Sequence, residues 1–280
     1  MAASENVSPR DTKNEAAPGA PRITREMLSL NQNILIAVLV MALAMVFMAF
    51  VNRRWPANER YAKEDLIGWQ LNILATTHAV ILGFMFYTEW TNFSAVKLNV
   101  ELEASALRNV FRLAEGLPQP ARAQLEDESR AYADAVVKDD WPMLERGQTP
   151  ELSHQINRSM WKTLMSVRQA SAAEITALDH ALSELSTLTQ CRRTRLLQAD
   201  SRLPGIFWWV LLVGGVLTVA SVAMFGSRNP RLHAFQVFSL TLLITLAMLA
   251  IADLDRPFAG SVHIDSYPFE RARDNMNEAT

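Results

Sequence analysis

Small and polar side chains follow one side of an apolar stretch, residues 66–88. Their spacings of three and four residues would place them on one face of a helix. The stripe consists of Asn72, Ala75, Thr76, Ala79 and Gly83. Its small members are spaced by four, which lets helices approach closely in lipid. The stripe therefore predicts either packing between helices of one chain, with Ala75 and Ala79 at the contact, or a helix around a symmetry axis whose polar atoms face water.

His78 lies within the same stretch, which carries no carboxylate, Lys or Arg. An ionisable residue inside a membrane is costly and is a candidate for function. A neutral histidine costs much less than a permanent charge, so a hydrogen-bonded structural role is the simpler interpretation. Gly214 and Gly215 lie in a later apolar stretch and are interpreted as helix-packing residues.

Catalytic and metal-binding patterns are missing from the sequence. The other histidines show no metal-ligand spacing, and there is no glycine-rich phosphate loop or nucleophile elbow. We therefore expect no enzyme activity, no metal and no cofactor. The net charge of -2 creates no global field for nucleic acid, so no nucleic-acid partner is expected. Cys191 is the only cysteine, cannot form an intrachain disulfide and is interpreted as structural.

Two charged clusters have ordinary interpretations. Asp139 and Asp140 are expected on a solvated helix surface or end. Arg192, Arg193 and Arg195 come shortly before an apolar stretch, so contact with anionic lipid headgroups is the expected role.

Four apolar segments set the architecture that positions these residues. A spanning helix needs roughly 20 mostly apolar residues. The segments that approach or exceed this length are residues 34–51, 66–88, 206–225 and 234–252. We therefore predict an all-α membrane protein with four transmembrane helices and a helical domain inserted between the second and third. The predicted parts are a disordered tail (1–30), spans one and two (31–90), the helical domain (91–203), spans three and four (204–253) and a polar C-terminal tail (254–280).

The second span is expected to continue out of the membrane as one long helix. No Gly or Pro interrupts the sequence between Gly83 and Gly116, and apolar positions recur at helical spacing. Three further helices are predicted in the inserted domain, with a turn at Trp141-Pro142. They cover about 121–138, 151–170 and 173–199.

Four spans place both termini and the inserted domain on one side of the membrane. Lys and Arg near span ends are somewhat more numerous on that side, which favours the cytoplasm. A domain without disulfides also suits a reducing compartment.

Four sequence stretches between Leu82 and Glu270 carry a family resemblance. They are LGFMFYTEWTNFSAVKLNVELEASALRNVFRLAEGLP, VVKDDWPML, RRTRLLQADSRLPGIFWW and LDRPFAGSVHIDSYPFE. In this order they resemble the bestrophin-like membrane domain of bacterial and plant proteins of uncharacterised function. That family is distantly similar to the bestrophins, which are pentameric ion channels with four spans per subunit, cytoplasmic termini and a pore lined by the second span.

The resemblance to bestrophins implies a pore neck. Leu82-Gly83-Phe84 and the later Trp90 resemble the second span of these channels, and the carried-over neck positions are Thr76, Val80 and Phe84. Thr76 departs from the three bulky apolar residues of that neck.

The segment after the fourth span resembles the bestrophins less closely. Arg256-Pro257-Phe258-Ala259-Gly260 stands where they have Pro-Phe-Gly, and the nearby acidic run is missing. Calcium control is therefore not implied.

The leading hypothesis is a homo-oligomeric, pentameric ion channel of the bacterial inner membrane, with the lipid bilayer and inorganic ions as partners. The candidate pore-lining residues are Asn72, Thr76, Val80, Gly83 and Phe84. The alternative is a non-conducting signalling or scaffold protein that acts through its cytoplasmic helical domain. The long helix that leaves the membrane motivates this alternative.

Overall fold

The computed structural model describes residues 30–55, 60, 64–168, 171–225, 227 and 229–278. Within these residues the regular elements are all helical, which confirms the predicted all-α class. They are α1 (Leu30–Arg54), α3 (Glu64–Ala114), α4 (Ala121–Ala135), the π-helical turn η1 (Val136–Asp140), α5 (Trp141–Glu145), α6 (Leu152–Ser166), α7 (Ala172–Asp200), α8 (Gly205–Met224), α9 (Pro230–Leu254) and α10 (Tyr267–Glu278). The predicted N-terminal tail lies outside the described residues, apart from Leu30.

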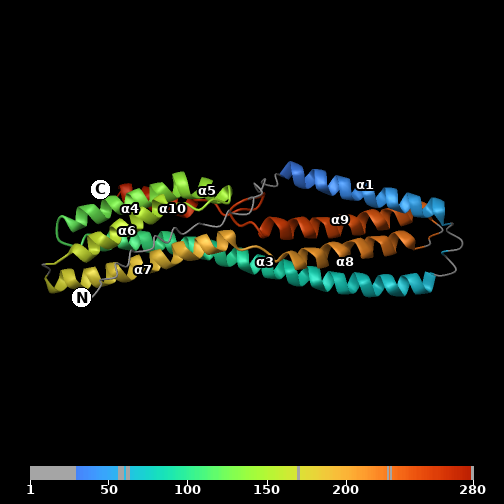
Figure 1. Cartoon of the computed structure of the whole chain (residues 1–280), viewed down its shortest axis with the longest axis horizontal. Helices are drawn as coiled ribbons and strands as arrows, with labels where there is room; N and C mark the ends of the chain where they lie inside the picture. The colour runs from blue at the N-terminus through green and yellow to red at the C-terminus, as the bar shows by residue number, and fades with distance from the viewer. Residues whose placement is uncertain are drawn as a thin grey trace, which may run out of the picture.

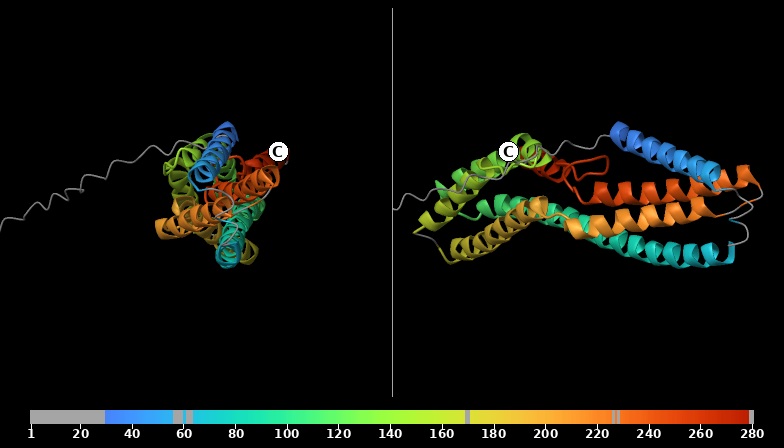
Figure 2. Two further views of the ribbon diagram at one scale, coloured as in Figure 1. Left: turned by 90° about the vertical axis from the view of Figure 1, so that its right-hand side faces the viewer. Right: turned by 45° about the vertical axis from the view of Figure 1, so that its right-hand side comes forward.

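The molecule is elongated and has two halves joined by α3. Helices α8 and α9 pack beside the first part of α3, with α1 on their other side. Helices α4, α7 and α10 pack beside its second part, and α6 packs against α4 and α7 (Figure 1). In the described chain, four helices are long and apolar enough to cross a membrane, namely α1, α3, α8 and α9. The right-hand view in Figure 2 shows the same division. We call these the apolar half and the polar half.

Helix α3 runs through both halves without a break. Its 51 residues correspond to a length of about 75 Å at the usual rise. The helix ends before Gly116 and Pro118, as the sequence predicts. One rigid element therefore connects the apolar half to the polar half.

The main hydrophobic core lies in the polar half. Its centre consists of side chains with no exposed surface, contributed by α3, α4, α6, α7 and α10. Among them are Val100, Leu107, Val110, Leu125, Met160, Leu185 and Phe269. Trp141 packs edge-on against Phe258, with ring centroids 5.6 Å apart.

One prediction for the polar half was wrong, and one of its helices was not predicted. The chain does not turn at Trp141-Pro142, because η1 carries the helix on and Pro142 lies at the start of α5, where proline is tolerated. The polar C-terminal tail contains α10, whose Phe269, Ala272 and Met276 are buried. Their spacing of three and four was the signal that could have identified this helix.

The apolar half has only a small core. It contains Ala44, Met48, Val222, Ala223 and Val237. Many large apolar side chains of α1, α8, α9 and the first part of α3 are instead exposed on the single chain. Such a surface suits lipid or another protein chain.

Candidate functional site

The residues proposed to line a pore share one exposed face of α3. Asn72, Thr76, Val80, Gly83 and Phe84 are all exposed. Val80 and Phe84 keep 56% and 68% of their surface accessible. The opposite side of this helix is the packed side, since the side chain of His78 is buried. The face is therefore left uncovered by the other helices of the described chain.

Two polar side chains on this face have no hydrogen-bond partner among the described residues. They are the Asn72 amide and the Thr76 hydroxyl. Further along α3, Thr88 donates to the carbonyl of Phe84 at 2.9 Å. The Thr76 hydroxyl lacks even this local bond, so both polar groups need water or a second chain.

The small residues of the stripe, Ala75, Ala79 and Gly83, lie on and beside this face. Ala79 and Gly83 are exposed, and a Cβ atom added at Gly83 would meet nothing within 4 Å. Ala75 is half-buried. A close helix contact at Ala79 and Gly83 is therefore open only to another chain, and the described chain does not use these positions for its own packing.

His78 points away from this face and packs against α8. The ring lies against Gly214 and Gly215, and a Cβ atom at Gly214 would overlap its Nδ1 atom and lie 3.1 Å from its Cε1 atom. Only 4% of His78 is exposed, and neither ring nitrogen has a hydrogen-bond partner among the described residues. The two glycines therefore make room for an imidazole that nothing in the described chain satisfies.

A groove of about 390 Å³ runs between α3 and α8 beside this ring. Its lining is almost entirely apolar. The lining residues are Leu74, Thr77, His78, Ile81, Trp209, Val210, Val213, Gly214 and Leu217. We call it the α3–α8 groove.

A second buried histidine, His233, has the role expected for His78. Its Nε2 atom lies 2.9 Å from the carbonyl oxygen of Val222, which connects the start of α9 to the end of α8. The prediction of a hydrogen-bonded His78 is not met within the described chain.

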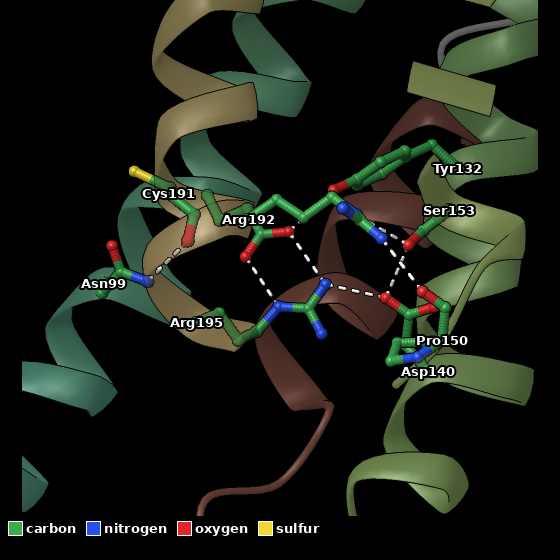
Figure 3. Close-up of polar contacts among 9 residues, drawn as sticks. Asn99, Tyr132, Asp140, Pro150, Ser153, Cys191, Arg192 and Arg195 are labelled. Carbon is green, nitrogen blue, oxygen red and sulfur yellow. Dashed lines mark hydrogen bonds and ion pairs between the residues drawn. The ribbon is translucent and has the colours of Figure 1, made fainter. Parts of the chain in front are cut away.

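An ion cluster that the sequence did not reveal lies in the polar half (Figure 3). Arg195 of α7 donates from Nε to Glu103 Oε2 and from Nη2 to Asp140 Oδ2, both at 2.8 Å. All three side chains have no exposed surface. The arginine therefore joins α3, η1 and α7 through two buried carboxylates.

Neighbouring side chains extend this cluster. Tyr132 donates to Glu103 Oε1 at 2.8 Å. Ser153 donates to Asp140 Oδ2 at 2.8 Å and accepts from Arg192 Nε at 2.9 Å. Burial, together with the Glu103 charge, raises the pKa of Tyr132 well above its ordinary value. The tyrosine therefore stays a neutral donor.

The Arg195 guanidinium keeps its charge despite its burial. Burial lowers its pKa, but Glu103 and Asp140 outweigh this effect and raise it. The lipid-headgroup role expected for Arg192 and Arg195 was wrong, as was the solvated surface expected for Asp140. Only Arg193 of the basic cluster is exposed.

Among the described residues, the ion cluster has a structural role and shows no arrangement for catalysis or metal binding. In the described part of the chain, no group of three or more His, Cys, Asp or Glu side chains could hold a metal ion. Cys191 is buried and free, and its carbonyl accepts a bond from Asn99 Nδ2 at 2.9 Å. The cluster joins α3 to its neighbours, and the uncovered groups of α3 remain the candidate functional site.

Comparisons with known proteins support the fold described above. Residues 38–269 match the Bestrophin-like domain. A point mutant of a bacterial Bestrophin homolog from Klebsiella pneumoniae has a similar structure, with a TM-score of 0.66 and 14% identity over 86% of this chain and 98% of that chain. Another structure of a bacterial Bestrophin homolog from Klebsiella pneumoniae gives a TM-score of 0.60 and 16% identity over 88% of this chain and 96% of that one. At such identities the likeness shows the fold alone. No curated protein sequence matches the chain.

Proposed function

This chain belongs to the bestrophin-like family of membrane proteins, and from that premise we propose that copies of it form an ion channel around the exposed face of α3. The single observation that carries the proposal is the unpartnered state of Asn72 and Thr76 on one exposed face of a mainly apolar part of α3. A polar group that faces hydrocarbon without a partner is costly. Water in an axial pore would remove that cost.

Ring symmetry converts this face into a pore. Identical copies around one axis place the same α3 residues in rings, and a ring of apolar side chains forms a constriction that can gate by dewetting. Val80 and Phe84 supply such rings, and Thr76 adds a polar ring one turn away. The likeness to bestrophins favours a pentamer.

The exposed face continues beyond the apolar half. Leu98 and Leu102, both in the polar half, are 61% and 49% exposed. A further contact between copies along the polar part of α3 would cover them. The proposed axis therefore runs along most of the helix.

The topology follows from the same proposal. The four apolar helices cross the bacterial inner membrane, and the polar half lies in the cytoplasm together with both termini. The polar half then forms a domain inserted between the second span, in α3, and the third span, α8.

Conduction by the purified protein in planar lipid bilayers tests the proposal. Val80→Ala and Phe84→Ala are expected to change the single-channel current, because they widen the apolar rings. Val46→Ala and Phe50→Ala are matched controls, since these residues are similarly exposed but lie on α1. The controls should leave the current unchanged.

Two results would count against the channel. One is a protein that is monomeric in detergent and in lipid nanodiscs and never conducts. The other is a stable, stoichiometric complex with a different protein in cross-linking experiments, which would favour the scaffold alternative.

A further inference from the structure

Three arginines gather on the polar half where α3 and α10 pack together. Arg108 and Arg112 lie one turn apart on the same side of α3, and Arg271 lies on α10. Arg108 is half-buried, and the other two are exposed. The charges of Arg271 and Arg112 both act on Arg108, so the three guanidinium groups lie near one another. We call them the arginine cluster.

No carboxylate of the described chain forms an ion pair with the arginine cluster. None of its three side chains has a hydrogen-bond or ion-pair partner among the described residues. Glu101 acts on Arg108 only from almost two turns earlier on α3. Glu270, the neighbour of Arg271, instead accepts a bond from Ser266 at 2.6 Å. Other arginines of the polar half do pair with carboxylates, namely Arg122, Arg130, Arg195 and Arg273.

The described chain therefore leaves the positive charge of this cluster without a neutralising partner. Burial, together with the charges of Arg271 and Arg112, lowers the pKa of Arg108, and the charge of Glu101 opposes this only in part. An anion bound between the three guanidinium groups would replace their mutual repulsion by attraction. The arrangement thus favours a negatively charged ligand.

The chemistry of arginine and the position of the cluster narrow the choice of ligand. A guanidinium group presents paired N–H donors that match the oxygens of a phosphate. Three such groups suit a ligand with several negative charges. Thr88 is the last residue of the apolar stretch, and the segment of α3 from there to Arg108 is about 30 Å long at the usual rise. Lipid headgroups at a membrane surface near Thr88 do not reach this distance, which favours a soluble anion.

We propose that the arginine cluster binds a soluble anion with two or more phosphate groups, whose oxygens accept hydrogen bonds from Arg108, Arg112 and Arg271. The membrane placement proposed above enters only where it sets lipid headgroups aside. The binding site itself does not depend on conduction, because its three side chains come from one copy of the chain.

Equilibrium binding of radiolabelled pyrophosphate to the purified intact protein in detergent tests the proposal. We expect saturable binding, and Arg108→Gln should weaken it at least about tenfold, the order expected for one charge-assisted hydrogen bond. Arg271→Gln should have a similar effect from a different helix. Arg193→Gln is the matched control and should leave binding unchanged, because Arg193 is exposed and unpaired among the described residues but lies on α7.

Variants of Arg112 separate specific hydrogen bonding from charge alone. Arg112→Lys keeps the positive charge but loses the paired donors of the guanidinium group. It should therefore weaken pyrophosphate binding, though less than Arg112→Gln does. Unlabelled orthophosphate should compete less well than unlabelled pyrophosphate, because it carries fewer charges. Elution of each variant at the wild-type size shows that the fold is intact.

Three outcomes would overturn the proposal. Equal weakening by Arg193→Gln and Arg108→Gln would mean that pyrophosphate senses only the overall charge of the surface. Loss of pyrophosphate binding in nanodiscs that contain phosphatidic acid, but not in discs of phosphatidylcholine alone, would assign the cluster to a lipid headgroup. Absence of saturable binding would mean that the cluster is only a solvated surface. Because the readout is binding, a protein that fails to conduct can still pass this test, and a conducting protein can still fail it.

Discussion

The two halves of the molecule differ in how far their apolar side chains are buried, although one helix runs through both. In the polar half, Val100, Leu107 and Val110 of α3 have no exposed surface. In the apolar half, Val80 and Phe84 of the same helix are mostly exposed. The polar half therefore folds around its own core, while the apolar half has to be completed by lipid or by further copies of the chain.

The polar groups of the two halves show the same contrast. In the polar half, Arg195 is buried with two carboxylates that are bonded to it. In the apolar half, Asn72, Thr76 and His78 have no partners among the described residues. Buried polar groups without a hydrogen-bond partner are rare in native proteins. Single buried atoms also lack a partner in the polar half, among them Arg195 Nη1 and Asp140 Oδ1, but these side chains are bonded through their other atoms, whereas both nitrogens of His78 are unpaired.

The largest effect is expected from Arg195→Met. This change leaves Glu103 and Asp140 buried without their cationic partner, which typically costs about 3–5 kcal/mol of stability. Thermal unfolding of the detergent-solubilised protein, followed by circular dichroism, measures the loss.

Arg122→Met is the matched control for Arg195→Met. Arg122 pairs with Glu126 at 2.9 Å, but 43% of its side-chain surface is accessible, so its loss should cost less than about 1 kcal/mol. If both variants unfolded at the same temperature, the claim that the polar half is held by its buried cluster would fail.

A smaller effect is expected from Gly214→Ala in the apolar half. The new methyl group would overlap the His78 ring, and such overpacking costs about 1–3 kcal/mol. Gly83→Ala introduces the same methyl group on the exposed face of α3, where nothing lies within 4 Å, and should not destabilise the chain. Unfolding temperatures of both variants provide the measurement.

A double variant sharpens this comparison. His78→Ala should remove most of the penalty of Gly214→Ala, because the two residues contact each other. An equal loss of stability from Gly83→Ala and Gly214→Ala would show instead that the two faces of α3 are covered alike.

The sequence predicted the apolar half better than the polar half for a physical reason. Long apolar runs determine helices such as α8 and α9 by composition alone, and the unbroken pattern after Gly83 predicted the length of α3. These signals are local. Helical spacing alone also places Thr76 and Val80 on one face, whereas the exposure of that face comes from the structure.

The buried cluster could not be predicted in this way, because its partners are distant in the sequence. Arg195 lies 92 residues from Glu103 and 55 residues from Asp140. Each charge taken alone resembles a solvated surface residue, and only the packing of α3, η1 and α7 brings them together. For the same reason the sequence did not show that the nitrogens of His78 lack partners. Spacing along α3 does not reveal which groups of α8 lie against this ring.

The smallest effect concerns the reactivity of Cys191, which probes how tightly the polar half is closed. Burial, and then the charge of Glu103, raises the pKa of this thiol. A raised pKa lowers the thiolate fraction at pH 8, and the thiolate is the form that reacts with maleimide. Labelling of the folded protein should therefore be at least about tenfold slower than labelling of the unfolded chain, and it should accelerate as the pH rises toward the raised pKa. Mass spectrometry of timed samples measures both rates.

A thiol on the uncovered face of α3 supplies the contrast to Cys191. Val80→Cys in a Cys191→Ser background places it there, because Val80 is mostly exposed on the single chain. Water in an axial pore would let a water-soluble maleimide reach this thiol, whereas a face sealed by lipid or by another helix would exclude the reagent. If this thiol reacted no faster than Cys191, the face would be closed to water and the proposed pore would lose its main support.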